Sequence, residues 1–330
     1  MRPSSVLITG AAGFIGRPLV RRLVAEGYPV RALVRASSDT RELQSPAIEI
    51  VRGDMRDPAD VARAMDGCRL AFHLAVDRSS REAILAGATN LADAAARAAV
   101  ARIVFTSSTG IYRRLGHGLV NEDTPTGPDP GYHTFQAAAE RIFLDRWSSG
   151  GSPVVIARVT SLGPGSPPWR GVFQAVADGS FRMIGDGRNH YQPIDVSDVV
   201  EGLFRCGTIP GIEGRTYILA GDRPHRLREI VRVIEKELGV TTSKSMIPLA
   251  ALRAYRALNN IVLARTGRNL PRHDRASFFL YDRSFDVSRA RMELGFTASV
   301  DLEEIVRRGA DSYREGGYLT NPRTSRIRSS

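Results

Sequence analysis

The sequence predicts an α/β protein in which a doubly wound parallel sheet carries a smaller C-terminal lobe. Two observations predict this fold. Short apolar runs alternate with helix-like segments through the first half of the 330 residues, and a glycine-rich turn follows the first apolar run. Strands that alternate with helices form a parallel sheet covered on both faces, and ligands bind at the carboxyl ends of its strands. We therefore expect the functional site at that edge of the sheet.

The glycine-rich turn predicts a dinucleotide site. It follows the first expected strand, residues 6–9, and precedes apolar residues at helical spacing between 19 and 24. In this context the backbone amides and the helix N-terminus bind a diphosphate, whereas a ligand-free turn is the alternative. Gly10 permits the tight turn, Gly13 lets the diphosphate approach, and Gly16 lets the helix pack close to the strand. The expected cofactor contacts are Gly10, Gly13, Phe14, Ile15 and Gly16.

The second expected strand, residues 29–34, ends beside Arg35. A carboxylate at this point would bind the ribose hydroxyls of NAD, whereas an arginine attracts the 2′-phosphate of NADP. Arg35, with Arg17 and Ser37 as further candidates, therefore favours NADP(H), with NAD still possible. A solvated surface arginine is the alternative in a chain so rich in arginine.

The later elements continue the alternation. We expect strands at residues 47–54, 70–75, 103–108 and 154–159, and helices at residues 60–65 and 84–99. Polar or small residues come at the ends of three of these strands: Gly53–Met55, Leu74–Ala75 and Ser107–Thr109. These residues are expected to line the site.

Composition limits the possible classes of function. The net charge of +11 is spread over scattered arginines without a basic motif interleaved with aromatic residues, so we expect no nucleic-acid partner. Cys68 and Cys206 match no metal or redox spacing. No apolar stretch approaches the length of a membrane span, and no signal-peptide pattern opens the chain. We expect a cytoplasmic protein without a metal site or a membrane partner.

Further motifs make the chain resemble the extended short-chain dehydrogenase/reductases of the NAD(P)-dependent epimerase/dehydratase family, over residues 5–310. The motifs are GAAGFIG at 10–16, GDMRD at 53–57, FHLA at 72–75, FTSSTGIY at 105–112, the segment from Tyr132, GPG at 163–165, VSDVVEG at 196–202 and ARMELGF at 290–296. The resemblance implies a Rossmann-type fold with a C-terminal substrate-binding lobe.

The resemblance also implies roles for single residues. Asp54 would accept a hydrogen bond from the adenine amino group beside the Met55 backbone, and Leu74 and Ala75 would line the path of the ribose and diphosphate. Tyr132 would be the general acid/base for hydride transfer at a hydroxyl or ketone. Ser108 would bind the reacting oxygen.

Gln136 departs from the family pattern, because the resemblance places a catalytic lysine at this position. The lysine binds the nicotinamide ribose and its charge lowers the pKa of the tyrosine. Glutamine can bind the ribose but carries no charge, so Tyr132 is expected to keep a pKa nearer its ordinary value of about 10. The neighbouring His133 has the wrong spacing for a substitute.

Fewer residues are expected to contact the substrate than the cofactor. Ser161 comes nearest to the asparagine by which sugar-nucleotide members contact the substrate phosphate, and Tyr191 occupies the position of their arginine. A phenol cannot neutralise a diphosphate, so Tyr191 weakens the case for a nucleotide sugar, although Arg182 and Arg188 are alternatives. An amphipathic helix expected at residues 248–264 would cap an apolar substrate or pack on the core.

These inferences give an interleaved domain organisation. Residues 1–160 and about 194–220 are expected to form the cofactor domain, residues 161–193 and 221–320 the substrate lobe, and residues 321–330 a disordered tail. The resemblance implies a homodimer through the helices at 84–99 and from Tyr132.

Two functions remain open. The first is an NAD(P)-dependent oxidoreductase or epimerase with an altered active site, acting on a sugar-derived or polycyclic small molecule. The second is a non-catalytic NADP(H)-binding sensor or assembly protein.

Overall fold

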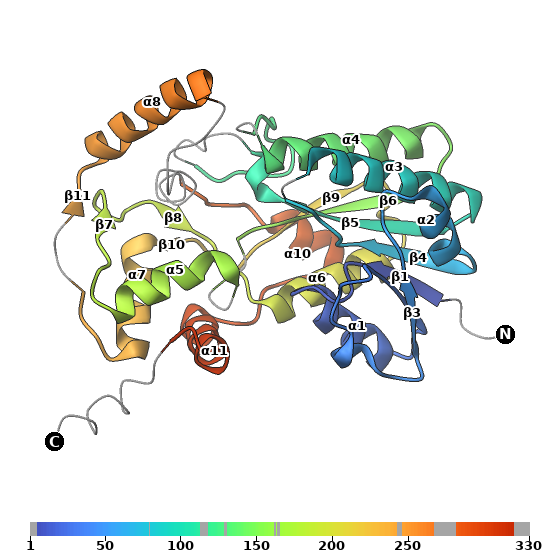
Figure 1. Cartoon of the computed structure of the whole chain (residues 1–330), viewed down its shortest axis with the longest axis horizontal. Coiled ribbons are helices and arrows are strands. Elements are labelled where there is room, and N and C mark those ends of the chain that lie inside the picture. Colours follow the sequence, from blue (N-terminus) through green and yellow to red (C-terminus); the bar gives the residue numbers. More distant parts are fainter. Residues whose placement is uncertain are drawn as a thin grey trace.

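A computed structural model of the chain describes residues 5–78, 80–112, 118–128, 131–161, 163, 166–242, 246–266 and 282–319. Its centre is a seven-stranded sheet in the order β3-β2-β1-β4-β5-β6-β9, with every neighbouring pair parallel (Figure 1). The strands are β1 (Ser5–Thr9), β2 (Val30–Val34), β3 (Ile48–Arg52), β4 (Cys68–His73), β5 (Arg102–Ser108), β6 (Val154–Val159) and β9 (Thr216–Leu219). The order reverses between β1 and β4, which is where such sheets open a crevice for ligands.

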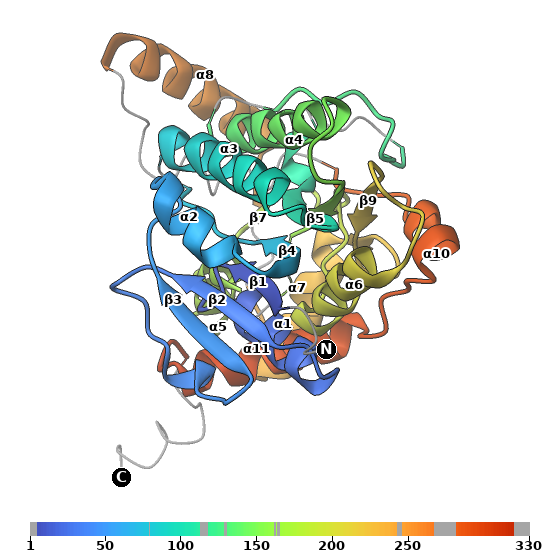
Figure 2. The ribbon, with the colours of Figure 1, turned by 90° about the vertical axis from the view of Figure 1, so that its right-hand side faces the viewer.

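Helices cover both faces of the sheet (Figures 1 and 2). One face carries α2 (Pro58–Met65), α3 (Arg81–Arg97) and α4 (Tyr132–Ser148), and the other carries α1 (Gly16–Ala25), α6 (Val196–Thr208) and α10 (Ser288–Leu294). Side chains alternate between the two cores, since successive strand residues point to opposite faces. In β5, Ile103 and Phe105 join the core under α3 and α4, while Val104 joins the core on the opposite face.

The helices that carry the site begin at defined residues. Ser80 caps α3 by accepting a hydrogen bond from the backbone N–H of Ala83. Gly131 precedes α4 with a φ of 124°, a backbone conformation that favours glycine, so the chain can turn sharply into Tyr132. Both helices therefore start at the carboxyl edge of the sheet.

The smaller lobe has a core of its own. Its elements are α5 (Pro167–Ala177), β7 (Met183–Ile184), β8 (His190–Tyr191), β10 (His225–Arg226), α7 (Leu227–Leu238), β11 (Met246–Ile247), α8 (Leu249–Thr266) and α11 (Leu302–Glu315). Strands β8 and β10 pair antiparallel, and β7 and β11 pair parallel. The core side chains include Trp169, Phe173, Ile230 and Tyr313. The described residues also include two 3₁₀ turns, η1 (Arg41–Leu43) and η2 (Thr109–Ile111).

The predicted fold class is confirmed. The sheet has one strand, β9 (Thr216–Leu219), that was not expected, and the expected elements differ from the observed ones at their ends. The strand expected at residues 154–159 has those bounds, whereas the one expected to end at Asp54 ends at Arg52. The helix expected from residue 84 begins three residues earlier, because the Ser80 cap sets its start. The expected tail at 321–330 lies outside the described residues, as do Pro164 and Gly165 of the GPG motif.

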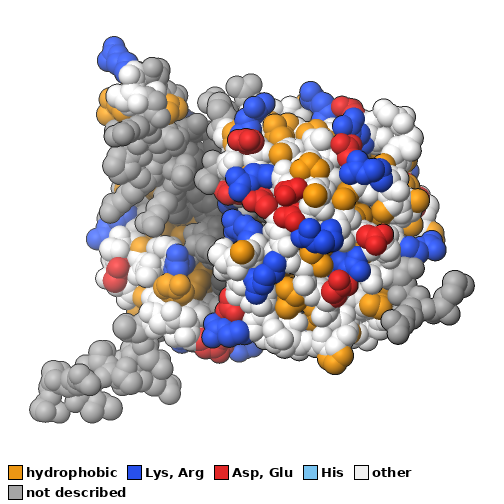
Figure 3. All heavy atoms as spheres, turned by 45° about the vertical axis from the view of Figure 1, so that its right-hand side comes forward, with side chains coloured by type: hydrophobic (Ala, Val, Ile, Leu, Met, Phe, Trp, Pro, Cys, Tyr) orange, Lys and Arg blue, Asp and Glu red, His pale blue; other side chains and the backbone are white. Residues whose placement is uncertain are grey.

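Charged side chains of both signs are interspersed on the face that Figure 3 shows. Ion pairs such as Arg31–Glu49 and Arg22–Glu201 neutralise part of the excess of arginine. Within the described ranges, no helix combines the length and hydropathy that a membrane span needs. The same ranges contain no group of three or more His, Cys, Asp or Glu residues placed to hold a metal ion.

Candidate active site

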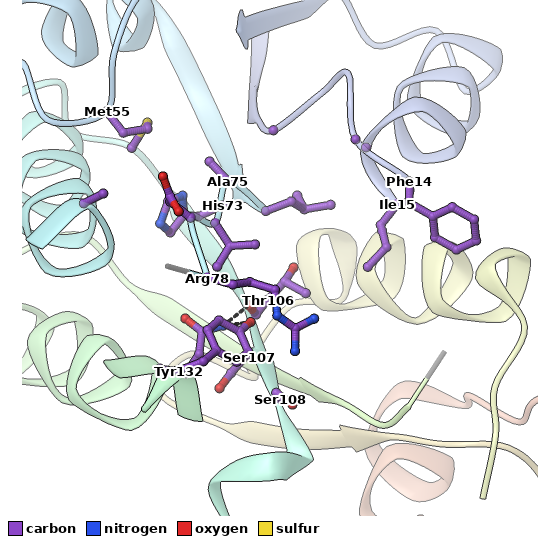
Figure 4. A pocket seen from close by; sticks show the side chains of 18 of the residues that line it. Phe14, Ile15, Met55, His73, Ala75, Arg78, Thr106, Ser107, Ser108 and Tyr132 are labelled. Atoms are coloured by element: carbon purple, nitrogen blue, oxygen red, sulfur yellow. Dashed lines mark hydrogen bonds between the residues drawn. The ribbon is translucent and has the colours of Figure 1, made fainter. Parts of the chain in front are cut away.

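A cavity of about 870 Å³ opens at the carboxyl ends of the central strands (Figure 4). It extends from the residues after β2 and β3, past the glycine-rich turn, to the start of α4 and the segment after β6. The cavity is lined by most residues that the sequence singles out: Gly10, Gly13, Phe14, Ile15, Gly16, Arg35, Asp54, Met55, Leu74, Ala75, Ser108, Tyr132, Gln136 and Ser161.

The glycine-rich turn forms a cradle that larger residues would fill. A Cβ added at Gly10, whose φ is 72°, would lie 2.8 Å from the backbone nitrogen of Ala75. A Cβ at Gly16 would lie 2.1 Å from the carbonyl oxygen of Gly10. Helix α1 starts at this turn without an acidic residue in its first turn, so its positive end faces the cavity unopposed. The residues present therefore fit the diphosphate of a dinucleotide.

The end of the cavity after β2 and β3 is rich in charge. Arg35 lines it, whereas Arg17 and Ser37 do not, and Arg17 instead binds Glu42 at 2.6 Å. Hydrogen bonds from Arg56 hold the pKa of Asp54 down at about 2, and the charge of Arg35 acts in the same direction. Asp54 is therefore an ionised acceptor at neutral pH.

Helix α3 fixes the neighbouring Met55. The side-chain amide of Asn90 donates to the Met55 carbonyl oxygen at 2.9 Å, and Gly87 leaves room for the Met55 side chain. The backbone beside Asp54 is thus held against α3 rather than left as a free loop.

Tyr132 and Gln136 lie one turn apart on α4, and their side chains meet. The Gln136 amide Nε2 donates to the Tyr132 hydroxyl at 2.9 Å and reaches the Thr106 carbonyl oxygen at 3.5 Å. Gln136 is only 4% exposed, so this geometry is held by packing. Burial raises the pKa of Tyr132, and the guanidinium of Arg78 and the hydrogen bond from Gln136 oppose that rise.

Two serines at the end of β5 face the same region (Figure 4). The Ser108 hydroxyl accepts a hydrogen bond from the backbone N–H of Gly110 at 3.1 Å and caps η2. The Ser107 hydroxyl is buried, and no described residue gives it a hydrogen-bond partner. Ser108 thus has its donor hydrogen available while its oxygen is held in place.

Tyr191 does not line the cavity. Its side chain is 1% exposed and packs edge-on against Trp169 in the core of the smaller lobe, and burial raises its pKa. Arg182 and Arg188 also lie outside the cavity lining. Arg182 instead donates to nearby backbone carbonyl oxygens, and Arg188 forms an ion pair with Asp186. Of the expected substrate contacts, the structure brings Ser108 and Ser161 to the cavity.

Sequence reasoning missed several ionisable residues of the lining: Asp39, His73, Arg78 and Arg283. His73 belongs to the FHLA motif, which was a signal for its position at the end of β4. Arg78 and Arg283 lie in segments without a helix or strand pattern, so their approach to the cavity depends on the tertiary fold.

Comparisons with known proteins agree with this geometry. The NAD dependent epimerase/dehydratase family matches residues 6–218. A putative dihydroflavonol 4-reductase from Synechocystis is 29% identical over 94% of this chain and 95% of its own. A dTDP-glucose 4,6-dehydratase from Streptomyces griseus is 30% identical over 91% of this chain and 90% of its own.

Solved structures are similar in fold. The crystal structure of gox2253 superposes with a TM-score of 0.83 and 24% identity, covering 96% of this chain and all of that one. A UDP-glucose 4-epimerase from Thermotoga maritima, solved with UDP-glucose, has a TM-score of 0.76 and 18% identity, with 94% and 99% of the chains covered.

Proposed function

Because the chain belongs to the NAD dependent epimerase/dehydratase family, whose named relatives here are reductases and dehydratases, we propose that it transfers hydride between NADP(H) and a small molecule. The reacting group is a hydroxyl or ketone of a sugar-derived or polycyclic compound. The observation that carries the proposal is that Tyr132, Gln136 and Ser108 line one cavity with the glycine-rich turn. The comparisons give no support to a non-catalytic role.

The cofactor site is proposed from the residues that line the cavity. The cradle of Gly10, Gly13 and Gly16 would hold the diphosphate, with Phe14 and Ile15 beside it, and Asp54 and Met55 would hold the adenine. Arg35 would attract the 2′-phosphate of NADP, while NAD remains possible because Asp39 also lines this end. When bound, the nicotinamide would supply or accept the hydride.

The chain's own residues would then transfer one proton and bind the reacting oxygen of the substrate. Tyr132 would give its proton to the substrate oxygen in reduction or take it in oxidation. Ser108 would donate a hydrogen bond to the same oxygen. Gln136 would hold the phenol in place through its 2.9 Å hydrogen bond and would bind the ribose with what remains of its hydrogen-bonding capacity.

The substrate class is proposed from relatives and from the cavity. Relatives include a ketoreductase acting on a farnesyl dihydroquinoline oxide in Stigmatella aurantiaca and a 2-alkyl-3-oxoalkanoate reductase in Shewanella oneidensis. Residues 161–193 and 221–320 would form the substrate lobe, except for α10 (Ser288–Leu294), which packs on the central sheet beside α6. Residues 1–160 with about 194–220 would form the cofactor domain. Ser161 would contact the substrate, whereas the burial of Tyr191 argues against a direct contact from that residue.

Assembly and location are also proposals. Helices α3 and α4 pack side by side on one face of the sheet, and the same two helices of a second copy would complete a homodimer. Both cysteines are buried and free, which suits a reducing cytoplasm.

Cofactor binding tests the first half of the proposal. We would titrate the purified protein with NADPH and NADH and follow cofactor fluorescence, using wild type, Arg35→Asp and Arg69→Asp. Arg69 is an exposed residue outside the cavity lining and serves as the matched control. We expect Arg35→Asp to weaken NADPH binding by about tenfold or more, with little change for NADH and none for the control. A wild type that binds neither cofactor would contradict the proposal.

Turnover tests the second half. With a panel of ketones and nucleotide sugars, Tyr132→Phe should abolish oxidation or reduction while it keeps the wild-type affinity for NADPH. Equal turnover by Tyr132→Phe and wild type would show that the phenol is not the acid/base.

A further inference from the structure

Tyr132 has a positively charged neighbour that the sequence pattern did not predict. Arg78 follows β4, and its guanidinium carbon lies 4.4 Å from the centre of the Tyr132 ring (Figure 4). We infer that Arg78 supplies the positive charge beside the phenol that Gln136 lacks, and so acts as a positioning residue for the acid/base. This inference rests on the proposed role of Tyr132.

The two neighbours approach the phenol from different directions. Gln136 reaches the hydroxyl oxygen from the next turn of α4, at 2.9 Å, whereas Arg78 lies over the face of the ring. A lysine would provide a hydrogen bond and a charge from one position. Here a neutral amide provides the hydrogen bond and a guanidinium from another segment provides the charge. A cation at this distance favours the ionised phenol over the neutral one.

The cavity lining holds further ionisable side chains besides Arg78, and each lies at a different place relative to Tyr132. Asp77 precedes Arg78 in the lining, and His133 places its ring 4.9 Å from that of Tyr132. His73, at the end of β4, is fully buried, and desolvation lowers its pKa to about 4, so it is neutral near pH 7. Arg283 lines the cavity from the segment before α10. Of these groups, it is the charge of Arg78 that lowers the pKa of Tyr132 against the effect of burial.

The assignment is tested by titrating Tyr132 directly in the ligand-free protein. Tyrosines labelled with ¹³C at Cζ would be followed by NMR from pH 7 to 12, and the Tyr132 signal identified by its loss in Tyr132→Phe. The variants are Arg78→Gln, Arg78→Lys and Arg81→Gln. Arg81 is an exposed arginine three residues further on, outside the cavity lining, and is the matched control.

We expect the Tyr132 midpoint to rise in Arg78→Gln and to stay near the wild-type value in Arg78→Lys and Arg81→Gln. Adding Gln136→Lys to Arg78→Gln should bring the midpoint down again, because the charge returns from the other side. A midpoint that is the same in Arg78→Gln and wild type, or that rises equally in Arg81→Gln, would overturn the assignment.

The same variants separate this inference from the proposed function. The NMR titration needs neither cofactor nor substrate, so it can support the charge assignment even if NADPH does not bind. Once a ketone substrate is found, Arg78→Gln should lower kcat for its reduction, with KM unchanged. The basic limb of that pH profile should move to higher pH, because the phenol stays protonated to higher pH. A rise in KM alone would show that Arg78 binds an anionic substrate instead and would overturn the inference.

Discussion

Glu140 and Arg158 form a buried ion pair that ties α4 to β6. Two guanidinium nitrogens of Arg158 donate to the two carboxylate oxygens of Glu140, at 3.1 and 2.8 Å. Glu140 is 4% exposed and Arg158 is 8% exposed. A further Arg158 nitrogen donates to the Tyr112 hydroxyl at 2.7 Å and to the Glu122 carbonyl oxygen at 3.0 Å. Glu140 lies one turn beyond Gln136 on α4, so this pair fixes the helix that carries the proposed acid/base.

Removing one member of this pair should destabilise the protein strongly. Arg158→Met leaves the Glu140 carboxylate buried without a counter-charge, which costs about 3–5 kcal/mol of unfolding free energy. Urea denaturation at pH 7 measures the loss. The double variant Arg158→Met/Glu140→Gln should recover part of it, because no charge is then left unpaired. A double variant that is less stable than the single one would contradict this account.

Gly10→Ala should impair cofactor binding beyond any general effect on stability. The new Cβ would push the Leu74–Ala75 segment that lines the cavity, and the φ of 72° adds strain of about 1–3 kcal/mol. Gly27→Ala is a matched control, because Gly27 has a φ of 82° but open space around its Cβ. Fluorescence titration should show NADPH binding weakened about tenfold or more in Gly10→Ala and unchanged in Gly27→Ala. Equal affinities in the two variants would refute the close-approach argument.

His73 should make stability fall in mild acid. Its ring accepts or donates one hydrogen bond, with the Thr9 hydroxyl at 2.7 Å, and stacks on Phe105. Burial lowers its pKa from 6.5 to about 4, so the unfolded chain binds a proton more readily than the folded one. The contribution is therefore fully present above pH 6.5 and is lost as the pH falls towards 4, on the order of 3 kcal/mol.

Urea denaturation at several pH values between 4 and 7 would measure this effect in wild type and in His73→Gln. Glutamine keeps a polar group near Thr9 but does not titrate. The difference in unfolding free energy between the two proteins should shrink as the pH falls. Parallel curves over this range would show that His73 does not titrate as expected.

Local sequence patterns predicted the fold and the neighbours within one element. Tyr132 and Gln136 are four residues apart on a helix, so their contact follows from helix geometry once the helix is recognised. Six of the seven strands follow from apolar runs with turns between them, whereas β9 (Thr216–Leu219) was not among the strands expected from the sequence. Arg78 could not be placed in this way, because its approach to Tyr132 joins the segment after β4 to α4, 54 positions later in the chain.

Tyr191 shows that a sequence pattern can also misplace a side chain. A family pattern assigned it to the substrate, but a large aromatic side chain is stabilised more by burial than by exposure in a wet cavity. It therefore packs with Trp169, while the backbone that follows it continues towards α6. A position in a sequence pattern therefore did not determine the direction in which this side chain points.

The last strand of the central sheet comes late in the chain. Strand β9 pairs with β6 only after the chain has left the sheet and built α5, β7 and β8. During synthesis, β6 is therefore an unpaired edge strand until β9 has been made. All six residues of β6 are buried in the finished protein, so this edge is apolar while it is exposed. Such an edge invites pairing with other chains. A fragment that ends shortly after residue 160 should thus aggregate, and a usable expression boundary lies beyond β9.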